Sequence, residues 1–151
     1  MKKTLLCLSV IFFITVIGFN IFDMQSNNAK DSSPTPKNVL GTELQACCFE
    51  PLTGWHRDGY CNTDARDRGV HVVCAEMTDA FLNYSASCGN NLKDPVGSHF
   101  PGLKAGDKWC LCVSRWKEAM TAGVAPPVFL ESTHAKALQT VTLEELKRYA
   151  K

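Results

Sequence analysis

The sequence predicts an α+β domain with a small mixed sheet, short helices and one long loop rich in Gly and Pro. Residues 70–77 (VHVVCAEM) are rich in β-branched side chains, which is typical of a strand. Segments with helix-capping residues lie on both sides of the Gly/Pro-rich stretch at 88–108. Because strands and helices alternate irregularly, the pattern indicates an α+β fold. The 151 residues are enough for one domain with a real core and not for two.

The N-terminus predicts a membrane segment over residues 1–22. Residues 4–22 carry no charge, and as a helix they would span about 28 Å, close to the roughly 30 Å hydrocarbon core of a bilayer. A cleaved signal peptide usually has a shorter apolar region, and Ala29 offers it a poor cleavage site. We therefore expect an uncleaved anchor in the membrane. Lys2 and Lys3 should stay in the cytoplasm, which sends the domain to the extracytoplasmic (periplasmic) side. Secretion to the periplasm is the alternative.

Two regions follow the anchor. Residues 23–37 (DMQSNNAKDSSPTPK) are polar and rich in Ser, Asn and Pro, which predicts a linker. Residues 38–151 form a cysteine-rich globular domain. The whole chain carries 16 Lys and Arg against 15 Asp and Glu, and no basic stripe alternates with aromatic residues. We therefore expect no nucleic-acid partner, and the sequence does not identify a protein partner.

Three consecutive elements are expected in the middle of the chain. The strand at 70–77 leads into a helix at 79–87, which Thr78 caps and Gly89 ends. The loop at 88–108 comes next, and loops of this length inside a compact domain are usually functional or disordered. We interpret it as a lid over the cysteines, with a solvated connector as an equal alternative.

Trp109-Cys110-Leu111-Cys112 predicts a buried strand with two thiols one residue apart. Alternate side chains of a strand share a face, so Cys110 and Cys112 should point the same way. Positions i and i+2 lie roughly 6.8 Å apart, beyond the roughly 3.5–4.5 Å between Cβ atoms that a disulfide needs. We therefore expect these thiols to ligate something together or to pair with cysteines of neighbouring segments.

The C-terminal part of the chain predicts four further elements, each from a local signal. Capping residues and glycine mark the helix ends, and a pair of prolines enforces an extended entry into the strand. The expected elements are a helix capped by Ser114 and ended by Gly123, a strand at 128–130, a short helix at 135–139 capped by Thr133, and a final helix opened by a capping box at Thr142.

Seven cysteines follow the predicted anchor. An outward-facing domain meets an oxidising compartment, where cysteines tend to pair. Because seven is odd, at least one of them is free, modified, bound to a metal or paired with another chain. The sequence therefore points to a thiol-centred site. The seven are Cys47, Cys48, Cys61, Cys74, Cys88, Cys110 and Cys112.

Several blocks of the chain resemble one known family. The domain is similar to the uncharacterised bacterial and plant family numbered 2237 among domains of unknown function. The blocks that carry the resemblance include NVLG at 38–41, HVVCA at 71–75, FPGL at 100–103, GDKWCLC at 106–112, AGVAPP at 122–127 and ESTH at 131–134. The resemblance implies no activity. It implies that Cys47, Cys61, Cys74, Cys110 and Cys112 match family positions and that the membrane segment is an addition. If family members without a membrane segment are cytoplasmic, the resemblance favours metal ligation or redox chemistry over disulfides.

The first hypothesis is a metal site built from Cys61, Cys74, Cys110 and Cys112, with His71 or His134 as a further candidate ligand. Thiolates and imidazole suit Zn, Cu(I) or an iron–sulfur cluster, and Zn is the first choice because four-coordinate sulfur and nitrogen sites are its usual environment. The spacings match no zinc-knuckle pattern. His71 would face away from Cys74 on a regular strand, so it can join only if it precedes the strand.

The second hypothesis is a thiol enzyme with a redox or acyl-transfer activity, using Cys110 or Cys112 as the nucleophile. Such a cysteine needs a nearby base and an orienting partner. His134 is the best candidate for the base, with Glu131 close before it, and Arg115 is a candidate for stabilising a thiolate. No C-x-x-C motif and no protease signature accompanies these residues.

The third hypothesis is a non-catalytic binding or structural domain whose cysteines are buried or paired in disulfides. Free Cys is among the most buried residue types, so this reading needs no special chemistry. It also accounts for Cys48 and Cys88 better than the other two. Asp67 lies in a turn with Gly69, where Asp commonly bonds its own backbone, and this predicts a structural role for its carboxylate.

Overall fold

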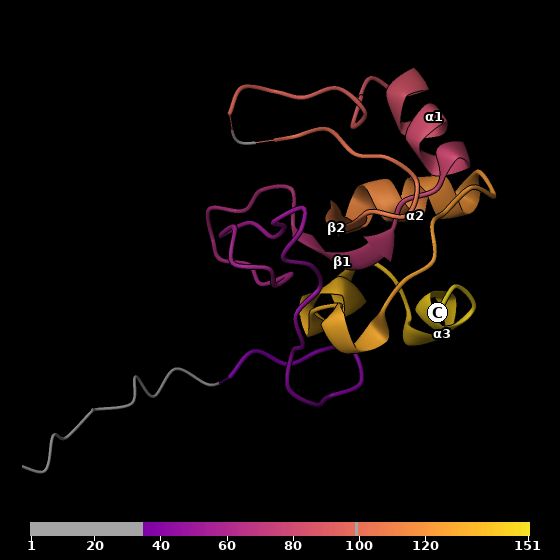
Figure 1. The fold of residues 1–151 in the computed structure, drawn as a ribbon. Helices are drawn as coiled ribbons and strands as arrows, with labels where there is room; N and C mark the ends of the chain where they lie inside the picture. Colours follow the sequence, from indigo (N-terminus) through magenta and orange to yellow (C-terminus); the bar gives the residue numbers. More distant parts are fainter. Residues whose placement is uncertain (1–34, 99) are drawn as a thin grey trace, which may run out of the picture. The chain divides into compact units, whose positions relative to one another are not determined.

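The computed structural model describes residues 35–98 and 100–151 (Figure 1). Within those residues a two-stranded antiparallel sheet combines with three α-helices and short 3₁₀ helices, which confirms the predicted α+β class. In chain order the elements are β1 (His71–Glu76), α1 (Asp79–Ser87), β2 (Lys108–Cys112), α2 (Val113–Thr121), the 3₁₀ helices η1 (Leu130–Ser132) and η2 (Ala135–Gln139), and α3 (Leu143–Lys147).

The pairing of β1 with β2 brings cysteines and a histidine together. In the middle of the sheet, Cys74 lies directly opposite Cys110. At its end, the first residue of β1, His71, lies opposite the last residue of β2, Cys112. The register shifts next to His71, and such irregularities re-aim side chains at the end of a ladder. The sheet therefore presents two separate groups of reactive side chains.

The prediction of a regular strand at 128–130 is wrong. The segment does lie along the edge of β1 that β2 leaves open, since Phe129 N–H donates to a β1 carbonyl (2.9 Å), but Val128 forms only isolated bridges. The chain then turns into η1, because the Ser132 N–H and the Thr133 hydroxyl both donate to the Phe129 carbonyl (3.2 and 2.8 Å). Local hydrogen bonds of this kind compete with strand pairing.

Two helices begin where the sequence predicts. The Thr78 hydroxyl accepts a hydrogen bond from Phe81 N–H at the start of α1 (3.1 Å), and the chain leaves that helix at Gly89, whose φ of +78° suits glycine. Thr142 opens α3 with a complete capping box: its hydroxyl accepts from Glu145 N–H (3.1 Å), and the Glu145 carboxylate accepts from Thr142 N–H (2.7 Å). These starts depend on residues within one turn of each other.

Two other helix starts differ from the prediction. Because α2 follows β2 without a break, Cys112 and not Ser114 is its N-cap residue. The N-cap of η2 is His134 and not Thr133, and the Nδ1 of His134 accepts from Lys136 N–H (2.9 Å). Thr133 is fully buried and its hydroxyl bonds to neighbouring backbone instead. Both differences arise from contacts with β1 and β2, which local capping rules do not include.

The hydrophobic core lies around the sheet and α2. Trp109 and Trp116 are both buried in it, as their apolar surroundings in the sequence predict. A second, smaller cluster consists of four buried cysteines with Phe129 packed against them. The largest fully buried side chains of the main core are Trp116, Phe81, Met77, Leu82, Leu146, Val72, Val73 and Val128.

The membrane prediction falls on residues that the structure does not describe. The predicted anchor at 1–22 and most of the predicted linker at 23–37 lie outside the described ranges. Across residues 35–98 and 100–151, none of the helices combines the length and the apolar character that crossing a bilayer requires.

Candidate functional site

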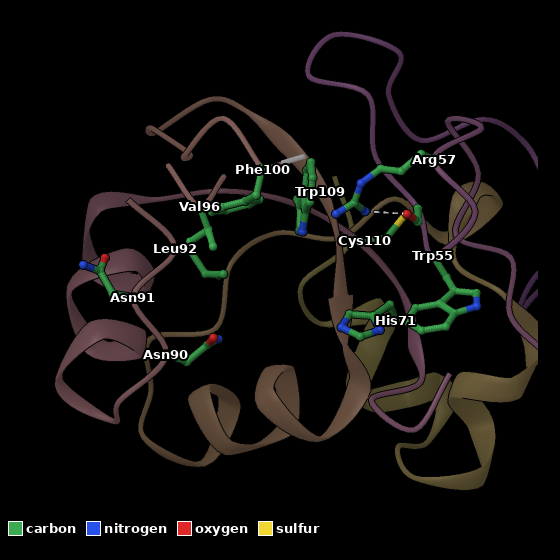
Figure 2. Close-up of a pocket in the computed structure, with 11 residues that line it drawn as sticks. Trp55, Arg57, His71, Asn90, Asn91, Leu92, Val96, Phe100, Trp109 and Cys110 are labelled. Carbon is green, nitrogen blue, oxygen red and sulfur yellow. Dashed lines mark hydrogen bonds between the residues drawn. The ribbon is translucent and has the colours of Figure 1, made fainter. Parts of the chain in front are cut away.

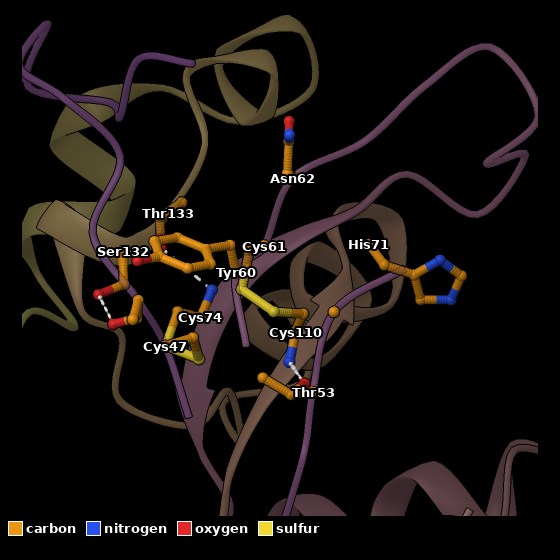
Figure 3. Close-up of a disulfide and its surroundings, with 12 residues drawn as sticks. Cys47, Thr53, Tyr60, Cys61, Asn62, His71, Cys74, Cys110, Ser132 and Thr133 are labelled. Carbon is orange, nitrogen blue, oxygen red and sulfur yellow. Dashed lines mark hydrogen bonds between the residues drawn. A yellow bond between two sulfur atoms is a disulfide. The ribbon is translucent and has the colours of Figure 1, made fainter. Parts of the chain in front are cut away.

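Two disulfides occupy the sulfur cluster of the domain (Figure 3). Cys74 of β1 bonds Cys47, Cys110 of β2 bonds Cys61, and all four residues are buried. Because Cys74 and Cys110 lie opposite each other, the bridges attach the segment that precedes β1, which contains Cys47 and Cys61, to neighbouring points of the sheet. Cys110 thus pairs with a cysteine of another segment and not with Cys112, as the strand geometry predicts.

Two buried threonines hold the strand backbone beside the disulfides. The Thr53 hydroxyl accepts a hydrogen bond from Cys110 N–H (2.9 Å), and the Thr133 hydroxyl accepts one from Cys74 N–H (3.1 Å) (Figure 3). Both threonines are fully buried. Since a buried N–H without a partner is destabilising, these hydroxyls help to fix the positions of the two bridged cysteines.

Three sulfur atoms of this cluster lie close enough together to hold a metal ion. The Sγ atoms of Cys47, Cys61 and Cys74 all lie within 4.8 Å of one another. The cluster includes Cys47, which the predicted metal site omits, and leaves out the predicted ligands Cys112 and His71. Metal ligation needs thiolates, so the paired sulfurs become ligands only after reduction.

The second group of reactive side chains is a triad of Cys112, His71 and Asp67, which we call the thiol triad. Strand pairing places Cys112 opposite His71, and a Cβ added at Gly69 would meet both the Cys112 Sγ and the His71 ring, so the thiol lies beside the imidazole. The Nδ1 of His71 lies 2.6 Å from Asp67 Oδ1, and the Asp67 side chain has no exposed surface. Asp67 Oδ2 also accepts from His71 N–H (2.8 Å) and from the Thr63 hydroxyl (2.9 Å). A buried carboxylate therefore orients a histidine that contacts a thiol outside both disulfides.

An unusual backbone turn brings the triad together. Val70 has a φ of +51°, which a β-branched residue rarely adopts. Its carbonyl accepts from Val72 N–H (3.0 Å) and from Val113 N–H (3.1 Å), so it connects the start of β1 to the start of α2. Strained backbone of this kind persists where the surrounding contacts enforce it, and it is enriched at functional sites. Here it sets His71 beside Cys112.

Gly69 leaves room for the contact between the thiol and the imidazole. A Cβ atom added at this position would lie 2.5 Å from His71 Cε1 and 3.0 Å from Cys112 Sγ. Real side chains essentially never come so close, and any residue other than glycine would displace the ring or the sulfur. Position 69 therefore requires glycine because a side chain there would collide with the triad.

The triad shifts the pKa values of His71 and Asp67 in opposite directions. Interaction with Cys112 is the largest cause that raises the pKa of His71 from 6.5 to about 9. Asp67 adds to this rise, and burial opposes it. Burial alone would raise the pKa of Asp67, but the hydrogen bonds from His71 and Thr63 hold it below its ordinary value. Asp67 is thus a carboxylate, and His71 is an imidazolium at neutral pH.

Two further side chains border the triad. Trp55 stacks on the His71 ring with a centroid separation of 6.0 Å and an interplanar angle of 10°. Arg115, on the first turn of α2, lines the same small cavity as Cys112 and His71. The pKa of Arg115 is raised, chiefly by the hydrogen bond to Glu118 and by the charge of that carboxylate. This is the position that the sequence analysis predicts for a cation beside the thiol.

Two cavities that share part of their lining border the triad, and Figure 2 shows the residues around the larger one. A cavity of about 70 Å³ is lined by Cys112, His71 and Arg115, and it shares His71 and Trp109 with a larger cavity of about 530 Å³. The loop at 88–108 contributes Leu92, Val96 and Phe100 to the wall of the larger one. The loop therefore borders the larger cavity, and its role as a lid stays a prediction.

The structure separates the predicted site residues into different places. Cys61, Cys74 and Cys110 belong to the disulfides, while Cys112 and His71 form the thiol triad. His134 caps η2, and its N–H donates to the β1 carbonyl of Val72 (3.0 Å), on the edge of β1 that faces away from β2. Burial lowers the pKa of His134. Glu131 is exposed, and its backbone carbonyl accepts from Asn38 and Gln45.

Sequence reasoning missed Asp67 as a functional residue. Its backbone does belong to a turn, since Val70 N–H donates to the Asp67 carbonyl (3.2 Å), but its carboxylate orients His71. The signal in the sequence is an Asp four residues before a His with Gly69 between them. A tight turn places such a carboxylate beside the imidazole that follows.

The raised pKa of His71 gives a prediction that NMR titration tests. We expect the His71 ring to titrate near pH 9 in the native protein and closer to 6.5 in Cys112→Ser, because interaction with Cys112 is the largest cause of the shift. Since the folded pKa lies above the ordinary value, His71 stabilises the fold fully below pH 6.5, and this contribution disappears as the pH rises through 9. Cys88→Ser, which removes a thiol outside the triad, should leave the titration unchanged.

Comparison with known proteins places the domain in one family. No match is found among curated proteins. The family described as "uncharacterized protein conserved in bacteria", DUF2237, matches residues 37–150, which is nearly the whole described chain and includes both disulfides and the thiol triad. The protein therefore belongs to the DUF2237 family, as the blocks in its sequence indicate.

Proposed function

We propose that the protein is a thiol-dependent acyl-transfer enzyme in which Cys112 is the nucleophile, His71 the base and Asp67 the residue that orients His71. The observation that carries the proposal is the order thiol, imidazole, buried carboxylate: the thiol lies beside the imidazole, and the imidazole bonds the carboxylate. Unrelated enzymes that form covalent acyl intermediates use the same order of groups. A purely structural role does not require the partly exposed thiol or the adjoining cavity.

The first step transfers an acyl group to Cys112. In the reactive state His71 already holds the proton as an imidazolium, and Cys112 attacks the carbonyl carbon of the donor as a thiolate. A bond forms between Sγ and that carbon, the bond to the leaving group breaks, and the imidazolium returns the proton to the leaving group. In the second step water or another acceptor attacks the thioester, His71 takes its proton, and Cys112 is released as a thiolate beside the imidazolium.

The start of α2 supplies groups that suit the oxyanion formed in both steps. Cys112 is the N-cap of this nine-residue helix and makes no side-chain capping bond. The N–H groups of the first helical turn lack intrahelical partners and point toward the N-terminus, where negative charge is favoured. The N–H of Val113 is bonded to Val70, so we assign oxyanion stabilisation to the N–H groups of Ser114 and Arg115.

A simple activated ester tests the proposal. We expect p-nitrophenyl acetate to leave one acetyl group on Cys112 of the full chain, detected by peptide mapping with mass spectrometry, and to release stoichiometric p-nitrophenolate. Cys112→Ser should lose both signals. Cys88→Ser, which removes another partly exposed thiol, should retain them. Equal acetylation of Cys48 and Cys88, or an unchanged rate in His71→Ala, would rule out a base-assisted nucleophile.

A second candidate function is metal binding by the reduced sulfur cluster. The close approach of Cys47, Cys61 and Cys74 supports it, and Cys110 becomes a fourth thiol when its bridge is reduced. Four thiolates suit Zn. Anaerobically reduced protein should then bind one Zn²⁺ with thiol protection against alkylation, and Cys47→Ser should weaken the binding. Retention of Zn²⁺ by Cys112→Ser would separate this site from the thiol triad, whereas no uptake by reduced protein would exclude it.

We also propose that the domain lies outside the cytoplasm, held by an anchor at residues 4–22. The uncharged run in the sequence and the two buried disulfides support this location, because disulfides persist in oxidising compartments. The full chain should then remain in the membrane fraction after alkaline carbonate washing, and protease added to spheroplasts should remove its domain. A domain protected from that protease would contradict the proposal.

A further inference from the structure

The cavity beside the thiol triad carries information about the acyl donor. It has a volume of about 530 Å³, which lies in the range of sites for small ligands. It is lined by His71 and by two aromatic side chains, Trp55 and Trp109. Cys112 lines the small cavity next to it, which shares His71 and Trp109 with it, so an acyl group attached to Cys112 lies at its border.

The walls of this cavity are largely apolar. Trp55 is 39% exposed and Val96 is 64% exposed, so both offer apolar surface that a ligand would cover. Phe100 packs edge-on against Trp109 with a centroid separation of 5.3 Å, which fixes the position of both rings. Burying such surface stabilises a bound apolar group by roughly 25 cal/mol for each Å² removed from water. The walls thus favour an acyl group with an aromatic or branched apolar body.

One cation, Arg57, stands in the same wall without an acidic partner. Its guanidinium carbon lies 4.9 Å from the centre of the Trp109 ring, and one of its nitrogens donates to the Gly54 carbonyl (2.6 Å) (Figure 2). Of the residues that line the cavity, none is Asp or Glu. Within the described part of the chain Arg57 belongs to no ion pair. Its charge is held in place but not neutralised.

A positioned guanidinium recognises a particular chemistry. Its remaining N–H donors form a planar fork that matches the two oxygens of a carboxylate. Contact with Trp109 limits the freedom of the side chain, so less conformational entropy is lost when an anion binds. The left-handed backbone at Arg57 (φ +54°) is unusual for a residue other than Gly, Asn or Asp, and such backbone is enriched at ligand sites.

We propose that the acyl donor of this enzyme carries a free carboxylate on an apolar body, and that Arg57 binds this carboxylate while Cys112 attacks the carbonyl carbon at the other end. The inference rests on the proposed acyl-transfer function and names its substrate class. Arg57 is a specificity-determining residue in this scheme and takes no part in the proton transfers. It should therefore act only on substrates that bear the negative charge.

A matched pair of esters tests the inference. The charged probe is the mono-p-nitrophenyl ester of 1,4-phenylenediacetic acid, and the neutral probe is the same compound with its free carboxylate methylated. We expect the native chain to be acylated faster by the charged probe, and Arg57→Gln to slow that reaction by about ten- to a hundredfold, as for the loss of hydrogen bonds to a charged group. The neutral probe should react equally with both proteins. Arg57→Lys should keep part of the preference, and Arg66→Gln, which removes an exposed arginine outside the cavity, should keep all of it.

Two other results would overturn the inference. Equal slowing of both probes in Arg57→Gln would mean that Arg57 only supports the fold, and a faster reaction with the neutral probe would mean that the cavity selects against the charge. A binding measurement tests the carboxylate subsite independently of acyl transfer. It follows the binding of 1,4-phenylenediacetate to Cys112→Ser by the quenching of tryptophan fluorescence. Binding that Arg57→Gln abolishes in that background would support the carboxylate subsite without the reaction, and no binding would reject it.

Discussion

Removing the disulfide between Cys61 and Cys110 by a double substitution to Ser is expected to lower the free energy of unfolding by about 4 kcal/mol. The bridge closes a sequence separation of 49 residues, and the loop-closure model assigns about 4 kcal/mol to a loop of that length. Both residues are almost fully buried, so the new hydroxyls would also need hydrogen-bond partners in a sulfur cluster that has few. Denaturant titration followed by tryptophan fluorescence measures the change.

The matched control for this prediction is Cys88→Ser. Cys88 is partly exposed, lies outside both disulfides and does not belong to the thiol triad. We expect its substitution to change the free energy of unfolding by less than about 1 kcal/mol, as most partly exposed substitutions do. A similar small loss in the double Ser variant would mean that the thiols of Cys61 and Cys110 are not bonded in the purified chain.

Much of the fold follows from local rules in the sequence. The strand at 70–77, the Thr78 cap and the Thr142 capping box each depend on a few adjacent residues, and the structure contains all three. The rule that strand neighbours at i and i+2 do not bond each other also holds for Cys110 and Cys112. Such features need no knowledge of what packs against them.

The site depends on contacts between distant segments, which local rules do not contain. The disulfide between Cys47 and Cys74 depends on the path of the segment that precedes β1. The meeting of His71 with Cys112 requires the antiparallel register and the shift beside it. On a perfectly regular strand, His71 faces away from Cys74, so the sequence predicts it as a ligand only if it precedes the strand. In the structure His71 is the first residue of β1, and it lies opposite Cys112 instead of joining Cys74.

Gly69→Ala is expected to slow acylation of Cys112 by about ten- to a hundredfold while the protein stays folded. The alanine Cβ would lie 2.5 Å from His71 Cε1 and 3.0 Å from Cys112 Sγ, so the ring or the sulfur must move by several tenths of an ångström or more. Displacements near 1 Å in a reacting pair can cost about a hundredfold in rate. Gly69 does not have a positive φ, so the substitution carries no left-handed backbone strain, and the effect isolates the contact within the triad. Burst kinetics with p-nitrophenyl acetate and denaturant titration measure rate and stability separately.

A double-mutant cycle decides whether Gly69 acts through the histidine. If the alanine methyl disables Cys112 by displacing His71, then adding Gly69→Ala to His71→Ala should cost little more, because the base is already absent. Independent effects that multiply would instead mean that the methyl group blocks the approach of the ester to Cys112. Without the His71 ring, the alanine still has its 3.0 Å approach to the sulfur, so the size of the remaining loss measures that steric part. Coupling between the two substitutions would establish the thiol and the imidazole as one working unit, which the proposed acyl transfer requires.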